Sequence, residues 1–186
     1  MPFPRKSSKP QVWLSEPALH EYALQSLGRR MRSEADLRRL MRAKVEPDEA
    51  GAAKVSVVVA RLKEYGYLDD TAYADNYVRL RQQNEKQGQR RVRQDLGQKG
   101  VSKEIISQTI EARYADISEE TLARQHLERK RIRKPENEKE TARVMRRLVT
   151  AGFSPTVIYK ILRQWDVSDE ALATLDNLED DAPADE

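Results

Sequence analysis

The sequence contains no cysteine, so disulfides, thiol nucleophiles and thiolate metal sites are all excluded. It has only two histidines, His20 and His126, which lie far apart and complete no metal or catalytic set. No apolar run reaches the length of about 18 residues that a membrane-spanning helix needs, and we expect no secretory signal. A P-loop and a Gly-rich dinucleotide turn are also missing. These absences predict a cytoplasmic protein with no catalytic residues, no metal and no cofactor.

The charged residues are unevenly distributed along the chain. All 34 Lys and Arg residues lie in residues 1–165 together with 22 of the 31 acidic residues, which gives this part a net charge of +12. The remaining nine acidic residues lie from Asp166 onward, where no basic residue occurs. A basic body with an acidic tail indicates a polyanionic or acidic partner, although a solvated helical surface would show the same charge.

Apolar residues recur with the period of an α-helix throughout the chain, and no convincing two-residue alternation is present. Even the β-branched stretch around Val55, Val58 and Val59 continues to Leu62 on one helical stripe. The pattern therefore predicts an all-α fold.

An internal repeat defines the organisation of these helices. The segment QDLGQKGVSKEIISQTI (94–110) aligns without a gap with RRLVTAGFSPTVIYKIL (146–162), at an offset of 52 residues. Gly100 and Gly152 then follow a helix, where a left-handed residue is favoured. Ser102 and Ser154 are predicted N-caps of the next helix. Each copy therefore reads as a helix, a tight corner and a second helix.

A further helix precedes each copy, and the first third of the chain resembles a degenerate copy in which Ala43-Lys44 replaces the corner glycine. We interpret that region as a loop insertion. The prediction is a monomer in which three three-helix units, stacked in tandem, form an elongated curved rod. Its parts are a flexible lead (1–15), three units (16–68, 69–116 and 117–166) and an acidic tail (167–186).

Two adjacent carboxylates, Asp69 and Asp70, stand just before the first helix of the second unit. Asp at a helix start accepts free backbone N–H groups and complements the helix dipole. No nearby histidine or second acidic cluster completes a metal set. We therefore interpret both as structural caps, with Gly66 ending the preceding helix.

Basic side chains are the stronger candidates for function. In the second unit they flank the predicted core stripes Tyr73/Tyr77/Leu80 and Val92/Leu96, so they should face solvent, where guanidinium groups suit phosphate or carboxylate. An ordinary solvated face is the alternative for each of them. The predicted partner-binding and DNA-binding residues are Arg79, Arg81, Arg90, Arg91, Arg93, Lys99, Lys103, Arg143, Arg146 and Arg147.

One stretch resembles a known family. The segment GYLDDTAYADNYVRLR (66–81), followed by Gly88, Arg91, Leu96 and Lys99-Gly100-Val101-Ser102, is similar to the signature of the RecX family. The resemblance implies a protein that binds in the groove of a RecA–DNA filament and inhibits strand exchange and ATP hydrolysis. A curved basic rod suits such a groove, where it is expected to contact both protomers and DNA phosphates. A freestanding DNA-binding module built from helix-turn-helix-like units remains the alternative.

Overall fold

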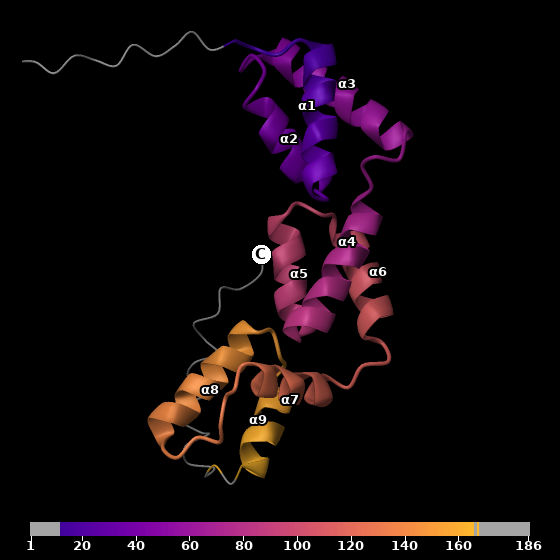
Figure 1. The fold of residues 1–186 in the computed structure, drawn as a ribbon. Coiled ribbons are helices and arrows are strands. Elements are labelled where there is room, and N and C mark those ends of the chain that lie inside the picture. Colours follow the sequence, from indigo (N-terminus) through magenta and orange to yellow (C-terminus); the bar gives the residue numbers. More distant parts are fainter. Residues whose placement is uncertain (1–11, 166, 168–186) are drawn as a thin grey trace, which may run out of the picture. The chain divides into compact units, whose positions relative to one another are not determined.

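The computed structural model describes residues 12–165 and 167, and every regular element in this range is helical (Figure 1). The all-α prediction is therefore confirmed. The chain divides into two compact units. One comprises the described residues up to Tyr73 together with Lys99–Val101, and the other comprises Ala74–Gln98 and the described residues from Ser102 onward. No helix of the described part is long and apolar enough to cross a membrane.

Three helices form the core of the first unit: α1 (Glu16–Arg29), α2 (Glu34–Arg42) and α3 (Glu49–Glu64). Local caps start two of them. The Ser33 hydroxyl accepts the Asp36 N–H, and the Asp48 carboxylate accepts the Gly51 N–H. Leu19, Ala23, Leu37 and Met41 meet a stripe of α3 in the core, and that stripe contains the predicted residues Val55, Val58, Val59 and Leu62.

The segment between α2 and α3 is the loop expected from the missing glycine. Ala43 ends α2 in a right-handed conformation with φ −74°, so no glycine is required there. Val45 is buried in the core, and the Lys44 carbonyl accepts the Leu14 N–H at 2.9 Å. The end of the predicted lead is thus attached to this loop.

The middle of the chain forms α4 (Asp70–Leu80), a π-helical turn (Arg81–Glu85), α5 (Gln89–Gln98) and α6 (Lys103–Tyr114). The predicted stripe on α4 was wrong at Leu80, which is 40% exposed, whereas Val78 is fully buried. The buried positions run from Ala74 through Val78 to Gln82 at intervals of four residues. Leu80 lies roughly 200° around the helix from Val78, on the opposite side.

The last three helices are α7 (Glu119–Arg129), α8 (Glu138–Thr150) and α9 (Pro155–Gln164). They enclose a core that includes Leu122, Met145, Leu148, Phe153 and Ile158. Ser118 and Asn137 cap α7 and α8 through their side chains, as residues of these types do at helix starts.

The corners of the repeat have the expected backbone. Gly100 has φ +74° and Gly152 has φ +88°, so both occupy the left-handed region in which glycine is favoured. Val101 and Phe153, the apolar residues that follow them, are buried. The three-helix repeat is confirmed, whereas the exact boundaries of the three units stay a prediction. Residues 1–11 of the predicted lead and 168–186 of the tail lie outside the described residues.

Candidate functional site

The arginines of α4 and its π-helical turn differ in how their charge is used. The Arg79 guanidinium donates to the amide oxygens of Asn76 (2.7 Å) and Gln83 (3.4 Å). These partners are neutral, so they orient the guanidinium without neutralising its charge. Arg81 instead forms an ion pair with Glu85, and its Cζ lies 4.9 Å from the centroid of the Tyr77 ring. The Arg81–Glu85 pair has i, i+4 spacing, which the sequence analysis overlooked.

The three arginines of α5 show the same division. Arg91 pairs with Asp95 at 3.0 Å, as its i, i+4 spacing predicts. Arg93 donates to the Ser107 hydroxyl of α6 at 3.2 Å and keeps its charge. The Arg90 side chain is exposed and has no ion pair or hydrogen bond within the described residues. Arg79, Arg90 and Arg93 are therefore the residues of this group that form no ion pair, although the charge of Arg79 helps to lower the pKa of the Asp75 carboxyl.

The start of α5 is held by the corner between α8 and α9. The Gly88 N–H donates to the Ala151 carbonyl at 2.8 Å, and the Arg90 N–H donates to the Gly152 carbonyl at 3.3 Å. These bonds satisfy N–H groups that a helix start leaves without partners. The corner that ends α8 is thereby placed directly against the first turn of α5, which carries Arg90 and Arg91.

The α8 helix adds three further predicted residues to the same unit. Arg143, Arg146 and Arg147 have i, i+3 and i+4 spacing and lie on one side of the helix. All three are exposed, and in the described part of the chain none forms an ion pair. Residues 79 to 93 of the basic set and those of α8 therefore belong to one compact unit, joined through the Gly88–Gly152 contact.

The two predicted lysines lie on either side of the corner between α5 and α6. Lys103 is exposed in the first turn of α6. Lys99 belongs to the first compact unit, where its carbonyl accepts the Ser33 hydroxyl at 2.6 Å. The structure thus brings nine of the ten predicted basic residues into one unit and leaves Lys99 in the other.

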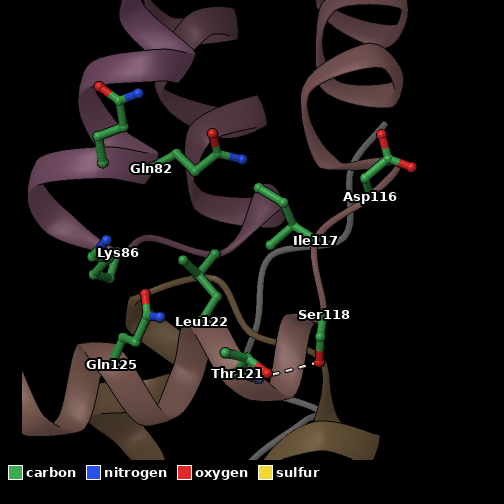
Figure 2. Close-up of a pocket in the computed structure, with 9 residues that line it drawn as sticks. Gln82, Lys86, Asp116, Ile117, Ser118, Thr121, Leu122 and Gln125 are labelled. Carbon is green, nitrogen blue, oxygen red and sulfur yellow. Dashed lines mark hydrogen bonds between the residues drawn. The ribbon is translucent and has the colours of Figure 1, made fainter.

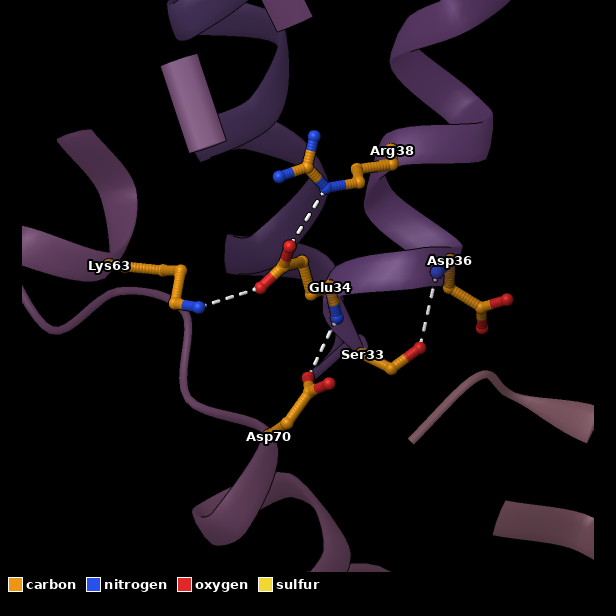
Figure 3. Close-up of polar contacts among 6 residues, drawn as sticks. All are labelled: Ser33, Glu34, Asp36, Arg38, Lys63 and Asp70. Atoms are coloured by element: carbon orange, nitrogen blue, oxygen red, sulfur yellow. Dashed lines mark hydrogen bonds and ion pairs between the residues drawn. The ribbon is translucent and has the colours of Figure 1, made fainter. Parts of the chain in front are cut away.

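The predicted caps do not all act on their own helices. Asp69 Oδ1 accepts the N–H groups of Thr71 (2.8 Å) and Ala72 (3.1 Å) at the start of α4. Asp70, the first residue of α4, accepts the Glu34 N–H at 2.7 Å and so caps α2, 36 residues earlier in the chain (Figure 3). Burial raises the pKa of the Asp70 carboxyl above its usual value.

The two serines of the repeat also differ. Ser102 accepts the Ile105 N–H at 3.4 Å and caps α6 through its side chain. Ser154 occupies the N-cap position of α9, but its hydroxyl makes no cap bond. Its N–H and its hydroxyl instead donate to the two carboxylate oxygens of Glu119, each at 2.7 Å. The predicted N-cap position of Ser154 is therefore confirmed, but its hydroxyl donates a hydrogen bond to a carboxylate of α7 and caps no N–H group of α9.

His126 of α7 lies beneath the π-helical turn and is 7% exposed. Its Nδ1 is 3.0 Å from the Glu85 carbonyl, so that nitrogen carries the proton and donates it. The ring also meets Phe153 edge-on, with 5.7 Å between centroids. Burial lowers the pKa of His126, which favours a neutral imidazole that joins α7 to the turn.

An open cleft of about 540 Å³ lies between the π-helical turn and the start of α7. Its lining mixes apolar and polar side chains, and the polar ones include Gln82, Lys86, Thr121 and Gln125 (Figure 2). Lys86 has φ +53°, a left-handed conformation unusual for a residue with a side chain. The cleft has no clustered acids or histidines. Among the described residues, no three His, Asp or Glu side chains lie close enough together to hold a metal ion.

Comparison with known proteins gives a consistent result. A model of the second three-helix domain of RecX matches residues 69–110. The regulatory protein RecX of Mycolicibacterium vanbaalenii is 30% identical over 146 residues, which cover 75% of this chain and 77% of the relative. The chain belongs to the RecX family of regulatory proteins. The family resemblance inferred from residues 66–102 is thereby confirmed.

Other RecX proteins show a similar degree of likeness. RecX of Mycolicibacterium smegmatis is 32% identical over 142 residues, covering 72% of this chain and 71% of that protein. Among solved structures, RecX from Lactobacillus salivarius matches with a TM-score of 0.62 at 21% identity, covering 81% of this chain and 96% of that chain. This structural likeness supports the all-helical RecX fold.

Proposed function

We propose that this RecX-family protein binds RecA filaments on DNA and inhibits their recombinase and ATPase activities without catalysing a reaction itself. Membership of a family of regulatory proteins supports a regulatory role. The proposed partner, RecA, comes from the family resemblance noted in the sequence. The observation that carries the proposal is the set of exposed, unneutralised arginines on α5 and α8, which can contact phosphates and acidic protein surfaces.

The proposed contacts divide by charge. Arg79, Arg90 and Arg93 form no ion pair within the described residues, and neither do Arg143, Arg146 and Arg147 on α8. Arg81 and Arg91 are already paired with carboxylates and contribute less. Phosphate contacts of this kind release counterions, so binding should weaken as the salt concentration rises.

The experiment that tests the proposal measures the ATPase activity of a cognate RecA on single-stranded DNA. Addition of the purified protein should slow hydrolysis in proportion to its occupancy of the filament. The protein alone should hydrolyse no nucleotide and cut no DNA. An intrinsic ATPase or nuclease activity that persists through purification to homogeneity contradicts the non-catalytic part of the proposal.

The alternative, a freestanding DNA-binding module, predicts a different ranking of affinities. Under that alternative, naked DNA should retain the protein as well as a RecA filament does at the same DNA concentration. Under the proposal, the filament should retain it much more strongly. Pull-down with biotinylated DNA, with and without RecA, distinguishes the two at one fixed salt concentration.

A further inference from the structure

Two large aromatic side chains stand exposed at the end of α3, in the first compact unit. Tyr65 is 62% exposed and Tyr67 is 60% exposed, with only Gly66 between them. Neither hydroxyl has a hydrogen-bond partner among the described residues. Sequence reasoning singled out the Gly66-to-Asp70 turn for its carboxylates and did not assign these rings a role.

The backbone that carries the two rings is fixed. The Gly66 N–H donates to the Lys63 carbonyl (3.0 Å) and the Tyr67 N–H donates to the Leu62 carbonyl (2.9 Å), which is the bond pattern of a Schellman motif. Gly66 supplies the left-handed residue at φ +72°. Leu62 and Leu68, on either side, are both buried in the core of this unit. The tyrosines are therefore presented by a rigid turn, which lowers the entropy lost when they bind.

The charges around the turn argue against a nucleic-acid partner. The two basic residues that precede it in the sequence are already paired with carboxylates, because Arg61 pairs with Glu16 (3.3 Å) and Lys63 pairs with Glu34 (2.9 Å; Figure 3). The carboxylates of Glu64 and Asp69 have no basic partner in the described part of the chain. A surface of this kind repels phosphates, whereas exposed tyrosines with an acidic border suit an apolar pocket with a basic rim on a protein.

We propose that Tyr65 and Tyr67 form an aromatic anchor for a protein surface that offers an apolar pocket with a basic rim. This inference rests on the proposed function, which identifies that surface with a RecA protomer. The anchor would hold the protein component of the filament, while the arginines of α5 and α8 contact DNA phosphates. Tyrosines of this exposure, carried on a rigid backbone, are typical of residues that dominate interface energies.

The test compares the Tyr65→Ser/Tyr67→Ser double variant with the wild-type chain. Affinity is measured separately for RecA without DNA and for naked single-stranded DNA. We expect the double variant to bind RecA at least about 30-fold more weakly, the effect of losing one strong interface residue. Its affinity for DNA should stay within about twofold of wild type. The matched control is Val57→Ser, an exposed apolar residue of the same helix about 12 Å along its axis, and it should change neither affinity.

A charge variant tests the predicted rim of the pocket. Glu64→Lys should weaken binding to RecA, because the new lysine would repel a basic rim. The variant itself should stay folded, because the exposed Glu64 side chain contacts no charged group among the described residues. Tighter binding of this variant to RecA overturns the basic rim.

Equal binding of wild type and the tyrosine double variant to RecA overturns the anchor alone. Parallel loss of DNA binding assigns the rings to base stacking and also overturns it. Absence of any binding of the wild-type chain to RecA, both free and in filaments on DNA, overturns the proposed function together with the anchor.

Discussion

Gly88 and Gly152 meet backbone to backbone. A Cβ atom added to Gly88 would lie 2.2 Å from the Gly152 carbonyl oxygen, and one added to Gly152 would lie 2.2 Å from the Arg91 nitrogen. Both glycines therefore lack a side chain because the corner of α8 and α9 must approach the start of α5 this closely. The contact joins the start of α5 to the corner that follows α8, so both arginine-bearing helices belong to one compact unit.

The first prediction concerns this contact. Gly88→Ala should lower the free energy of unfolding by about 1–3 kcal/mol, the usual cost of forcing an atom into a packed site. The matched control is Gly97→Ala in α5, because a Cβ there would meet nothing within 4 Å. That variant should raise stability by up to about 1 kcal/mol, since alanine favours a helix more than glycine does. Urea unfolding of both variants checks the pair, and equal effects would contradict the close contact.

A similar contact occurs in the first compact unit. There Gly100, at the position equivalent to Gly152, lies against Ala35 at the start of α2, and the Lys99 carbonyl accepts the Ser33 hydroxyl. Lys99 is equivalent to Ala151, whose carbonyl accepts the Gly88 N–H. The sequence repeat explained the bend at both glycines. It did not reveal that each corner also contacts the start of an earlier helix. Ser33 makes its contact through a hydroxyl and Gly88 through its backbone N–H, so the two positions have no residue type in common.

The second prediction separates the two aspartates that follow Leu68. Asp69→Ala should cost about 0.5–2 kcal/mol of stability, because the N–H groups of Thr71 and Ala72 lose their acceptor. Asp69→Ser should recover most of that loss, since serine also caps helices well. Inhibition of RecA, measured well below the melting temperature, should remain near normal in both. Complete loss of inhibition at unchanged stability would assign Asp69 a direct contact instead.

The third prediction concerns Asp70, whose carboxylate caps α2 rather than its own helix. Asp70→Ala should cost about 1 kcal/mol, because the Glu34 N–H loses its partner. Asp70→Asn keeps an oxygen acceptor and removes a charge that burial penalises, as the raised pKa indicates. We therefore expect the asparagine variant to be at least as stable as wild type at pH 7. Thermal unfolding measures both, and a less stable asparagine variant would show that the charge itself is required.

Such long-range partners mark the limit of what the sequence could predict. The helices and the corner glycines were predicted from local patterns, and the Arg91–Asp95 pair has the i, i+4 spacing that a helical pattern indicates. The Asp70–Glu34 and Ser154–Glu119 bonds join residues 36 and 35 positions apart, so no local pattern indicates them. The exposure of Leu80 also depended on how α4 packs. Its buried side continues from Val78 to Gln82, which leaves Leu80 on the opposite side.

The fourth prediction is a loss of stability at mildly acidic pH. Burial lowers the pKa of His126 below its ordinary value of 6.5, so the unfolded chain binds a proton more readily than the folded chain. Stability should therefore fall as the pH decreases below about 6.5. His126→Asn keeps an N–H donor for the Glu85 carbonyl and cannot titrate, so it should reduce this dependence. Melting temperatures at pH 7.5 and 5.5 measure the effect, and an unchanged slope in the variant would exclude His126 as its source.

The last prediction concerns the arginines of α4 and α5 that form no ion pair within the described residues. Reversing Arg79, Arg90 and Arg93 to Glu should change helicity and melting little, because none of the three belongs to a buried stripe. Binding to RecA–DNA filaments should weaken by several kcal/mol, since each charge-assisted contact contributes about 1.5–3 kcal/mol and repulsion adds to the loss. Wild-type binding should also fall steeply between low and moderate salt.

A charge-matched comparison separates a specific face from net charge. The neutral triple variant with Gln at positions 79, 90 and 93 is compared with Arg39→Gln/Arg61→Gln/Arg124→Gln, which removes three arginines that are paired with carboxylates. Both variants lose three positive charges, so a purely long-range effect would weaken binding equally. We expect the first to bind filaments much more weakly than the second at about 100 mM salt, where screening is incomplete. If the Glu triple variant binds as tightly as wild type under these conditions, the three arginines belong to an ordinary solvated surface. The filament must then bind another part of the chain.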